Sequence, residues 1–272
     1  MKTHPTAIVE DGARLGNGVE IGPFCVVGPH AVLGDSVRLL SHVAITGNTQ
    51  IGARTVVYPQ AVLGGPAQMR STKPSAERLV IGADNVIREG VSISTGSHVG
   101  NGVTTVGDRN YLMAYSHVGH DCQIGNDVTL SNGVLIAGHV EIGDGVIMGG
   151  LAAAQQFGRI GRYAFISGLS GVSTDVIPYG IAIGLHVRLG GLNLVGLRRR
   201  GIPRPNIHAL RAAYRAIFLE GHGSIQDNAR NVQDKWADVP EVREVIAFIL
   251  ADAKRAICPA RKRGADAGDD ES

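Results

Sequence analysis

The sequence predicts a mainly β protein, namely a parallel β-helix built from six-residue repeats and followed by a small α-helical domain. An aliphatic residue returns at every sixth position, as at Val9, Leu15, Ile21 and Val27, and this series continues to Leu63. A glycine often follows the aliphatic residue. A small or β-branched residue lies four positions after the aliphatic residue. A period of six fits neither an α-helix nor the alternation of a flat sheet, and it is typical of a coiled solenoid.

The six-residue pattern is interrupted twice and returns each time. It covers residues 81–93 after the first interruption and residues 106–172 after the second. If three hexads form one triangular coil of about 18 residues, neighbouring coils stack at the usual strand spacing of roughly 4.8 Å. The patternless stretches predict excursion loops at about residues 64–80 and 94–105, and loops on a rigid scaffold commonly carry function.

The chain divides into three parts. We expect the β-helix with its loops to cover residues 1–187, and a helical domain to cover residues 188–259, where the period of six gives way to helical spacing. Within the helical domain, Ser224 is a candidate N-cap and Pro240 a candidate first residue of a helix. Residues 260–272 mix charged residues with glycine and are expected to form a disordered tail.

The amino-acid composition argues against several classes of function and location. The formal net charge is +2 and only 4% of the residues are aromatic, which argues against nucleic acid as a partner. The first residues lack the apolar stretch of a secretory signal, and no apolar run is long enough for a transmembrane segment. Cys25 and Cys122 occupy inward positions of their hexads, which predicts buried free thiols and a cytoplasmic, reducing location.

The clearest chemical signal is the hexad His117–Cys122, which contains two histidines and one aspartate. A valine and a cysteine take its inward positions, so His120 and Asp121 belong to the turn. One coil of about 18 residues further along lie Gly138 and His139. We therefore expect an imidazole, a carboxylate, a second imidazole and an unhindered backbone amide to meet on neighbouring coils.

This constellation suits acyl transfer to a hydroxyl group. A histidine oriented by a carboxylate can act as a general base, and a backbone N–H can bind the oxyanion that forms on the acyl carbonyl. Three other interpretations stay open: histidines that only decorate a surface, a zinc enzyme resembling the γ-carbonic anhydrases, and a non-catalytic scaffold. The H-x-x-H spacing is shorter than the long-range ligand set of such zinc sites, so we expect no metal and no cofactor.

The chain resembles a known family over nearly its whole length. The motifs that carry the resemblance are HVGHDC, LIAGHVEIGD, QQFGRIG and GLRRRG, in this order, whereas the hexapeptide pattern alone is shared by many acyltransferases. These motifs resemble the UDP-N-acetylglucosamine O-acyltransferases of lipid A biosynthesis. The resemblance implies a left-handed β-helix and a homotrimer with active sites between subunits. It also implies transfer of an R-3-hydroxyacyl chain from acyl carrier protein to the 3-position of the UDP-linked amino sugar.

The same resemblance implies roles for individual residues. His120 would be the general base, Asp121 would orient it, and the Gly138 amide would bind the oxyanion. The matching substrate-binding positions are Gln68, His117, His139, Gln155, Gln156, Gly168, Asn193, Arg199 and Arg200. Gly168 matches the position that limits acyl-chain length, where glycine leaves room for a longer chain. A solvated charge run is the alternative interpretation of Arg198–Arg200.

Five positions depart from the family's motifs. A loop acid, a loop lysine, two histidines and an acidic residue are replaced, respectively, at Met69, Ser71, Ser94, Gln155 and Val195. The base, its carboxylate and the oxyanion glycine are retained, whereas groups that would contact sugar and phosphate are altered. We therefore hypothesise, as the alternative to O-acylation, that the acceptor is a 3-amino analogue of the UDP sugar and that the product is an amide.

Overall fold

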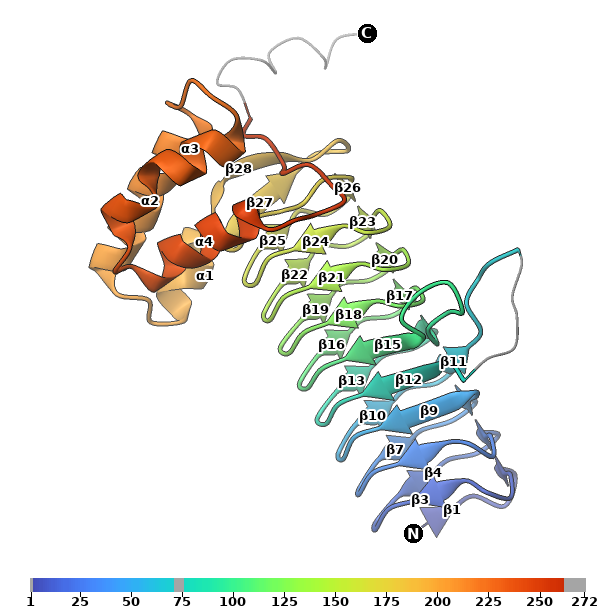
Figure 1. The fold of residues 1–272 in the computed structure, drawn as a ribbon. Helices are drawn as coiled ribbons and strands as arrows, with labels where there is room; N and C mark the ends of the chain where they lie inside the picture. Colours follow the sequence, from blue (N-terminus) through green and yellow to red (C-terminus); the bar gives the residue numbers. More distant parts are fainter. Residues whose placement is uncertain (1, 71–75, 262–272) are drawn as a thin grey trace, which may run out of the picture.

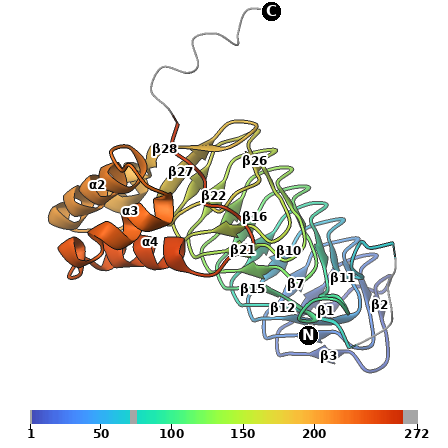
Figure 2. The same ribbon diagram turned by 45° about the horizontal axis from the view of Figure 1, so that its top comes forward.

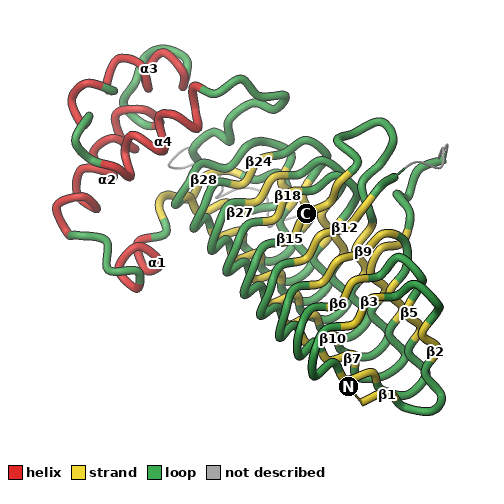
Figure 3. Tube along the Cα trace, turned by 60° about the horizontal axis from the view of Figure 1, so that its bottom comes forward, coloured by secondary structure: helices red, strands yellow, loops and turns green. Residues whose placement is uncertain are grey.

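Stacked coils of short parallel strands make up most of the molecule, and helices cover one end of the stack. The computed structural model describes residues 2–70 and 76–261. In Figure 1 the coils follow one another from the N-terminus, in blue, to the helices, in orange. Figure 3 separates the prism of strands and turns from the helical part. The predicted fold class is confirmed: the chain is a left-handed parallel β-helix with a C-terminal helical domain.

Each coil adds one strand to each of three sheets, which we call A, B and C. In the first coils, Lys2 pairs with Glu20 in sheet A, Ile8 pairs with Val26 in sheet B, and Arg14 pairs with Val32 in sheet C, always in parallel. Each of these pairs is separated by 18 residues, as the numbering shows (20 − 2 = 18). Residues 18 positions apart therefore lie one above the other along the prism.

Most strands are two residues long, because each side of the triangular coil is short. Sheet A consists of β1 (Lys2–Thr3), β4 (Glu20–Ile21), β7 (Arg38–Leu39), β10 (Val56–Val57), β13 (Val86–Ile87), β16 (Tyr111–Leu112), β19 (Thr129–Leu130), β22 (Ile147–Met148), β25 (Phe165–Ile166), β27 (Gly180–Ile183) and β28 (Arg188–Leu192). Sheet B consists of β2 (Ile8–Val9), β5 (Val26–Val27), β8 (Ala44–Ile45), β11 (Val62–Gly65), β14 (Ser92–Ser94), β17 (His117–Val118), β20 (Leu135–Ile136), β23 (Ala153–Ala154) and β26 (Gly171–Val172). Sheet C consists of β3 (Arg14–Leu15), β6 (Val32–Leu33), β9 (Asn48–Ile51), β12 (Arg78–Ile81), β15 (Val103–Val106), β18 (Gln123–Ile124), β21 (Glu141–Ile142) and β24 (Arg159–Ile160).

The interior of the prism is filled by the two inward positions of each hexad, as the sequence predicted. Leu33 and Val37, four residues apart, are 1% and 0% exposed. Cys25 and Cys122 are buried free thiols in the same core. Burying one aliphatic side chain contributes roughly 1.5–3 kcal/mol. Because each coil touches only its neighbours, this stabilisation is spread evenly along the stack.

The turns between sheets bring outward side chains into columns. At one corner Asp121, His139 and Phe157 follow each other at intervals of 18, and their φ angles are 60°, 61° and 63°. This left-handed conformation is uncommon for residues other than glycine, although Asp and His adopt it more readily than most. The glycines after the aliphatic positions serve close approach instead: a Cβ on Gly52 would lie 2.5 Å from the carbonyl carbon of Gly82 on the next coil.

Both excursion loops leave the prism at the same corner, where the chain passes from sheet B to sheet C. The first joins β11 to β12 through residues 66–77, of which 71–75, including the departure Ser71, lie outside the described residues. The second joins β14 to β15 through residues 95–102. It is shorter than predicted because Ser94 and Val103 are strand residues.

A hairpin ends the β-helix. β27 pairs in parallel with β25, but β28 pairs with β27 in the antiparallel sense. Sheet A therefore continues to Leu192, beyond the predicted boundary at residue 187, because the chain turns back on itself before the first helix begins. The following segment forms α1 (Leu194–Arg199), a short helix that helical spacing did not predict.

Three longer helices form the C-terminal domain. They are α2 (Arg204–Phe218), α3 (Ile225–Val232) and α4 (Pro240–Leu250), and a 3₁₀ turn η1 (Asp234–Trp236) follows α3. Ser224 caps α3, because its hydroxyl accepts a hydrogen bond from the Asp227 N–H at 3.1 Å. Pro240 is the first residue of α4, where its missing N–H costs nothing. Both helix starts agree with the residues that the sequence singled out.

Residues 251–261 return from α4 to the β-helix, and we call this segment the C-terminal strap. The Cys258 N–H donates to the Asp175 carbonyl at 2.8 Å, and the Leu189 N–H donates to the Pro259 carbonyl at 2.9 Å. Figure 2 shows this segment, in red, leaving α4 and running over the last coils towards β28. Ala260 and Arg261, which we expected in a disordered tail, pair with Leu189 instead. The rest of that predicted tail, residues 262–272, lies outside the described residues.

Helices capable of crossing a membrane are absent from the described part of the chain, since none combines the required length with sufficient apolar character.

Candidate active site

The corner between sheets B and C gathers the predicted catalytic residues. His120 and Asp121 lie between β17 and β18, and Gly138 and His139 lie one coil further along, between β20 and β21. The two coils are joined at this point by a hydrogen bond from the His139 N–H to the His120 carbonyl, at 2.9 Å. The register predicted from the spacing of 18 residues is therefore confirmed.

The imidazole of His120 lies against the backbone of Gly138. A Cβ added to Gly138 would lie 2.5 Å from Cε1 and 2.6 Å from Nε2 of His120, so only glycine leaves room for the ring in this position. Among the described residues, no hydrogen bond uses the Gly138 N–H. A backbone N–H that has no acceptor and lies beside a base can stabilise an oxyanion.

The carboxylate of Asp121 is buried and accepts four hydrogen bonds. His120 Nδ1 is 2.8 Å from Oδ2, and the Ser97 hydroxyl donates to Oδ2 at 2.5 Å. The backbone N–H groups of Ser97 and Gly102 donate to Oδ1 at 3.1 and 3.0 Å. Burial by itself would raise the pKa of Asp121, but the hydrogen bonds from Ser97 and His120 outweigh it, and the pKa lies below its ordinary value.

An ionised Asp121 fixes the tautomer of His120. Because the carboxylate only accepts hydrogen bonds, the proton of the neutral imidazole must lie on Nδ1, which faces Asp121. The lone pair is then on Nε2, the atom that lies towards Gly138. The site thus presents a basic nitrogen and a free N–H donor side by side.

His139 forms the next layer of the same corner. Its ring meets the ring of His120 edge-on at 4.9 Å and stacks on Phe157 at 4.5 Å. Its Nε2 is 3.9 Å from Oδ2 of Asp121. Partial burial lowers the pKa of His139 despite the nearby Asp121 carboxylate, and the positive charge of Lys254 acts in the same direction. His139 is therefore held in its neutral form beside the base.

His117 points outward from sheet B next to this corner. The hydroxyl of Ser92, on the neighbouring strand β14, lies 2.8 Å from its Nδ1. Burial lowers the pKa of His117, so it too is neutral near pH 7. The neighbouring departure Ser94 is buried at the end of β14, just before the second excursion loop.

The other expected substrate residues are spread around the prism. Gln155 and Gln156 lie at the B-to-C corner, one coil beyond Gly138, whereas Gly168 lies between β25 and β26, at the A-to-B corner. Gln68 is an exposed residue of the first loop, beside the departure Met69. These positions do not all meet within one chain, since they occupy different edges of the prism.

The residues after β28 lie near the third corner, between sheets C and A. The side-chain amide of Asn193 is used within the chain: its oxygen caps α1 and its nitrogen donates to the Tyr163 carbonyl at 3.0 Å. Arg200 donates to the Gly145 carbonyl and its guanidinium lies 4.0 Å from the centre of the Tyr163 ring. Arg199 is exposed at the end of α1. The departure Val195 is exposed on the same helix.

Several residues of the corner were not predicted from the sequence. Ser97 and Gly102 hold the Asp121 carboxylate from the second loop, Phe157 stacks on His139, and Arg255 of the strap contacts Gln155. Phe157 could have been found, because it lies 18 residues after His139 in the same column. Ser97 and Arg255 could not, because a loop and the strap lie outside the repeat.

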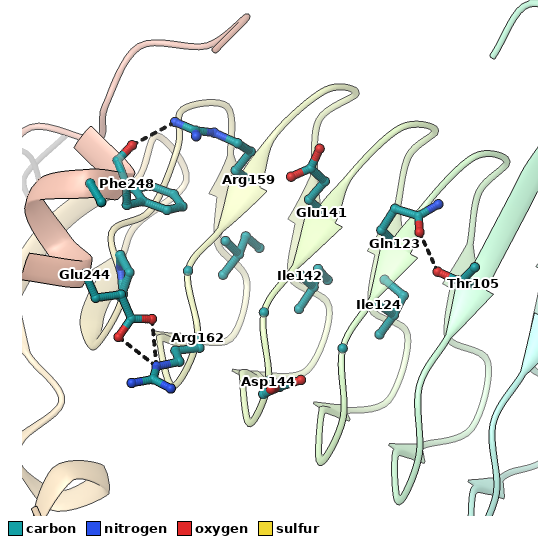
Figure 4. Close-up of a pocket in the computed structure, with 16 residues that line it drawn as sticks. Thr105, Gln123, Ile124, Glu141, Ile142, Asp144, Arg159, Arg162, Glu244 and Phe248 are labelled. Atoms are coloured by element: carbon teal, nitrogen blue, oxygen red, sulfur yellow. Dashed lines mark hydrogen bonds and ion pairs between the residues drawn. The ribbon is translucent and has the colours of Figure 1, made fainter. Parts of the chain in front are cut away.

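Two hollows lie on the outward face of sheet C. The smaller, of about 450 Å³, reaches the B-to-C corner and is bordered by Asp121, His139, Phe157 and Lys254. The larger, of about 720 Å³, extends from there beneath α4. Figure 4 shows it as a row of polar side chains from successive strands, closed at one end by ion pairs of Arg162 with Glu244.

The cluster of His120, Asp121 and His139 must also be weighed as a metal site. One ligand atom from each residue lies within 4.8 Å of the others. However, Asp121 already accepts four hydrogen bonds, one of them from Nδ1 of His120. A metal ion would have to displace these donors, so the donor set fits a hydrogen-bonded base better than a zinc centre.

A hexapeptide β-helix with a histidine–aspartate pair beside a free amide defines a transferase of the hexapeptide class. Residues 104–138 match the family model described as bacterial transferase hexapeptide (six repeats). Residues 175–258 match the model described as UDP-N-acetylglucosamine O-acyltransferase, domain 2. The second match covers the end of the β-helix and most of the helical domain.

Similar proteins extend this match to nearly the whole chain. The acyl-[acyl-carrier-protein]–UDP-N-acetylglucosamine O-acyltransferase of Sinorhizobium fredii is 49% identical over 263 residues, 97% of each chain. The enzyme of the same name from Rhizobium etli is 51% identical over 94% of each chain. Among solved structures, UDP-N-acetylglucosamine acyltransferase from Campylobacter jejuni is 35% identical with a TM-score of 0.90, covering 96% of this chain and 100% of its own. The chain belongs to the UDP-N-acetylglucosamine O-acyltransferase family.

Replacing Ser97 by alanine removes the 2.5 Å hydrogen bond to the Asp121 carboxylate. We expect the free energy of unfolding to fall by about 1.5–3 kcal/mol at pH 7, the usual value for a hydrogen bond to a charged group. The folded-state pKa of Asp121 lies below its unfolded value, so this stabilisation is complete above about pH 4 and is lost as the pH falls through the folded pKa.

Chemical unfolding of wild type and Ser97→Ala at pH 7 and pH 3 measures the effect. The difference between the two proteins should shrink at pH 3, where more of the carboxyl is protonated. An equal difference at both pH values would mean that Ser97 does not act through the charge of Asp121.

Proposed function

We propose that this chain transfers a 3-hydroxyacyl chain from acyl carrier protein to the 3-hydroxyl of UDP-N-acetylglucosamine, the first step of lipid A biosynthesis, with His120 as the general base. The observation that carries the proposal is the meeting of His120, Asp121 and the free Gly138 N–H at one corner of the prism. Relatives about 50% identical over most of the chain bear the name of this reaction.

The chemistry follows from the geometry of the corner. Nε2 of His120 takes the proton of the sugar hydroxyl as the oxygen attacks the thioester carbonyl carbon. The carbonyl oxygen becomes an oxyanion, which the Gly138 N–H stabilises. When the tetrahedral intermediate collapses, the carbon–sulfur bond breaks and the imidazolium of His120 returns the proton to the departing thiolate. Asp121 stabilises the imidazolium between these two steps, without taking its proton.

A single chain leaves the site open on one side, so we propose that the enzyme works as a homotrimer. Gly168 and the Arg199–Arg200 pair lie on different corners from His120, and only a second copy could bring them to it. The outward row of sheet B is mostly apolar and suits such a contact. Its apolar side chains are Ile8, Val26, Ala44, Val62, Leu135 and Ala153, and the polar residues Ser92 and His117 lie between Val62 and Leu135 in the same row. A contiguous apolar patch exposed to water marks an interaction site, and Ile8, Val26, Ala44 and Val62 lie one above the other on this face.

The aliphatic residues that lie outside the inward positions of the hexads are the interface candidates that the sequence offers, namely Val26, Val32, Val56, Ile147 and Leu151. They do not all lie on one face of the prism. Val32 points out from sheet C, whereas Val56 and Ile147 belong to sheet A. Val26 alone of the predicted residues lies in the row of sheet B, and Leu151 lies at the neighbouring A-to-B corner, where it is 64% exposed. Val26, Val32, Val56 and Ile147 are the first residues of two-residue strands and point outward. Every third hexad belongs to the same sheet, and this count assigns them to different faces of the prism.

We place the reaction in the cytoplasm, where the buried thiols Cys25, Cys122 and Cys258 would stay reduced. The scaffold and zinc-enzyme alternatives receive less support, because the base, its carboxylate and the free amide form a complete set for acyl transfer. N-acylation remains the second candidate on the grounds of the altered residues Met69 and Gln155, although the relatives are named as O-acyltransferases.

Product analysis distinguishes these functions. The purified protein is incubated with 3-hydroxyacyl carrier proteins and with UDP-N-acetylglucosamine, its 3-amino analogue, or both, and the products are identified by mass spectrometry. We expect an ester at the 3-oxygen, which mild alkali hydrolyses, and no change of rate on addition of a chelator. An alkali-stable amide formed in preference from the mixture would establish N-acylation, and no acyl transfer at all would refute the proposed function.

Replacing His120 by alanine removes the general base. We expect kcat to fall by about 10²- to 10⁴-fold, the usual contribution of a positioned base, with little change in KM or in melting temperature. His208→Ala, an exposed histidine on α2, is the matched control and should behave as wild type. A kcat of His120→Ala within a few-fold of wild type would exclude His120 as the base.

Replacing Val62 by arginine places a charge in the outward row of sheet B. Val62 is 42% exposed in one chain. If this face is the subunit contact, an unpaired buried arginine costs several kcal/mol, so the trimer should dissociate and activity should fall although His120 is intact. Light scattering measures the mass. Leu219→Arg, at an exposed position after α2, should stay trimeric, and a fully active Val62→Arg trimer would contradict the assignment.

A further inference from the structure

The C-terminal strap is hydrogen-bonded to the catalytic corner through a single side chain. Nη1 of Arg255 donates to the side-chain oxygen of Gln155 at 3.1 Å, and Nε donates to the backbone carbonyl of Gln156 at 3.0 Å. Gln156 lies 18 residues after Gly138 in the column that contains His120. A residue of the helical domain therefore contacts the coil next to the oxyanion site.

The strap holds Arg255 in place independently of this contact. The Asp175 N–H donates to the Ala256 carbonyl, and the Cys258 N–H donates to the Asp175 carbonyl, both at 2.8 Å. The carboxylate of Asp175 is fully buried and accepts a hydrogen bond from Nε of Arg159 at 2.7 Å. The backbone next to Arg255 is thus fixed to the end of the β-helix by hydrogen bonds that do not involve Gln155.

The chemistry of the two side chains sets the orientation of the amide. A guanidinium can only donate hydrogen bonds, so the oxygen of the Gln155 amide must face it. The two N–H groups of that amide then point away from Arg255. Among the described residues, no hydrogen bond uses them as donors, and the side chain is exposed at the corner. The contact with Arg255 therefore occupies the oxygen of the Gln155 amide and leaves its two N–H groups available to a ligand.

We propose that Arg255 is a positioning residue that fixes Gln155 as a hydrogen-bond donor to an acceptor oxygen of the substrate. The inference rests on the proposed function and deepens it. Both substrates carry such oxygens: the diphosphate of the UDP sugar, and the phosphate and amide carbonyls of the carrier protein's pantetheine arm. The acceptor lies one coil from the reacting carbonyl, on the side of the helical domain. In the absence of Arg255 the amide could rotate by 180° and present its oxygen instead.

Gln155→Glu separates this role from a merely structural one. Glutamate has the same shape and keeps the contact with Arg255 as an ion pair, but it has no N–H donors. We expect its melting temperature to equal or exceed that of the wild type. We also expect KM and Kd for one substrate to rise about tenfold, with kcat changed less than twofold, because a donor is lost and a negative charge faces the acceptor oxygen.

Arg255 is tested by two variants and a control. Arg255→Ala should raise KM for the same substrate about threefold, because the amide is free to rotate, and Arg255→Lys should restore part of the loss. Arg243→Ala, an exposed arginine on α4, is the control and should match the wild type. KM is measured separately for UDP-N-acetylglucosamine and for acyl carrier protein, and the substrate whose KM rises is the one that supplies the oxygen.

Direct titration calorimetry with each substrate gives Kd without turnover. An inactive wild-type protein that still binds UDP-N-acetylglucosamine or acyl carrier protein would therefore count against the proposed reaction alone, while the Kd values decide on Gln155. Wild-type affinity of Gln155→Glu for both substrates would overturn the inference. So would a lower melting temperature of Arg255→Ala with unchanged KM, because the strap would then only stabilise the fold.

Discussion

The stacking of residues 18 positions apart is the constraint on which the rest of this structure depends. It places the small and aliphatic side chains of successive coils in contact, and it places the turn residues in columns along each corner. His120 and Gly138 face each other because they occupy the same position on neighbouring coils, and Asp121 and His139 do so for the same reason. A slip of one residue would turn inward side chains outward and would separate the imidazole from the amide.

Insertions are tolerated where the register is restored after them. Ser92 pairs with His117 although the second loop lengthens that coil, so the strands on both sides stay aligned. Both loops are inserted at the B-to-C corner, the corner that holds His120 and Asp121. The second loop uses this position to place a hydroxyl and two backbone N–H groups on the Asp121 carboxylate. Donors fixed in this way stabilise the charge of the Asp121 carboxylate without reorganisation.

The second excursion loop holds the B-to-C corner from one side, and the helical domain holds it from the C-terminal end of the β-helix. The helical domain is joined to the last coils by the hairpin of β27 and β28 and by the C-terminal strap, which pairs with Asp175 and Leu189. The strap carries Arg255 to Gln155 and Lys254 to the ring of Phe157. The B-to-C corner is thus supported by the second excursion loop on one side and by the C-terminal strap on the other. The remaining corners carry Gly168 and Arg200, and this separation within one chain is a physical argument for assembly.

The sequence by itself determined everything that repeats. The aliphatic period predicted the β-helix, its inward residues and the meeting of His120 with Gly138, because in a solenoid the distance along the chain converts directly into position in space. It also located the helix starts at Ser224 and Pro240 from local capping chemistry. Only the tertiary structure decided the contacts made by segments outside the period. Ser97 contacts Asp121 from a loop, and Arg255 contacts Gln155, which is 100 residues away in the sequence. The side-chain amide of Asn193 caps α1 and donates to the Tyr163 carbonyl. Such contacts depend on how a non-repeating segment folds back, which no spacing along the chain specifies.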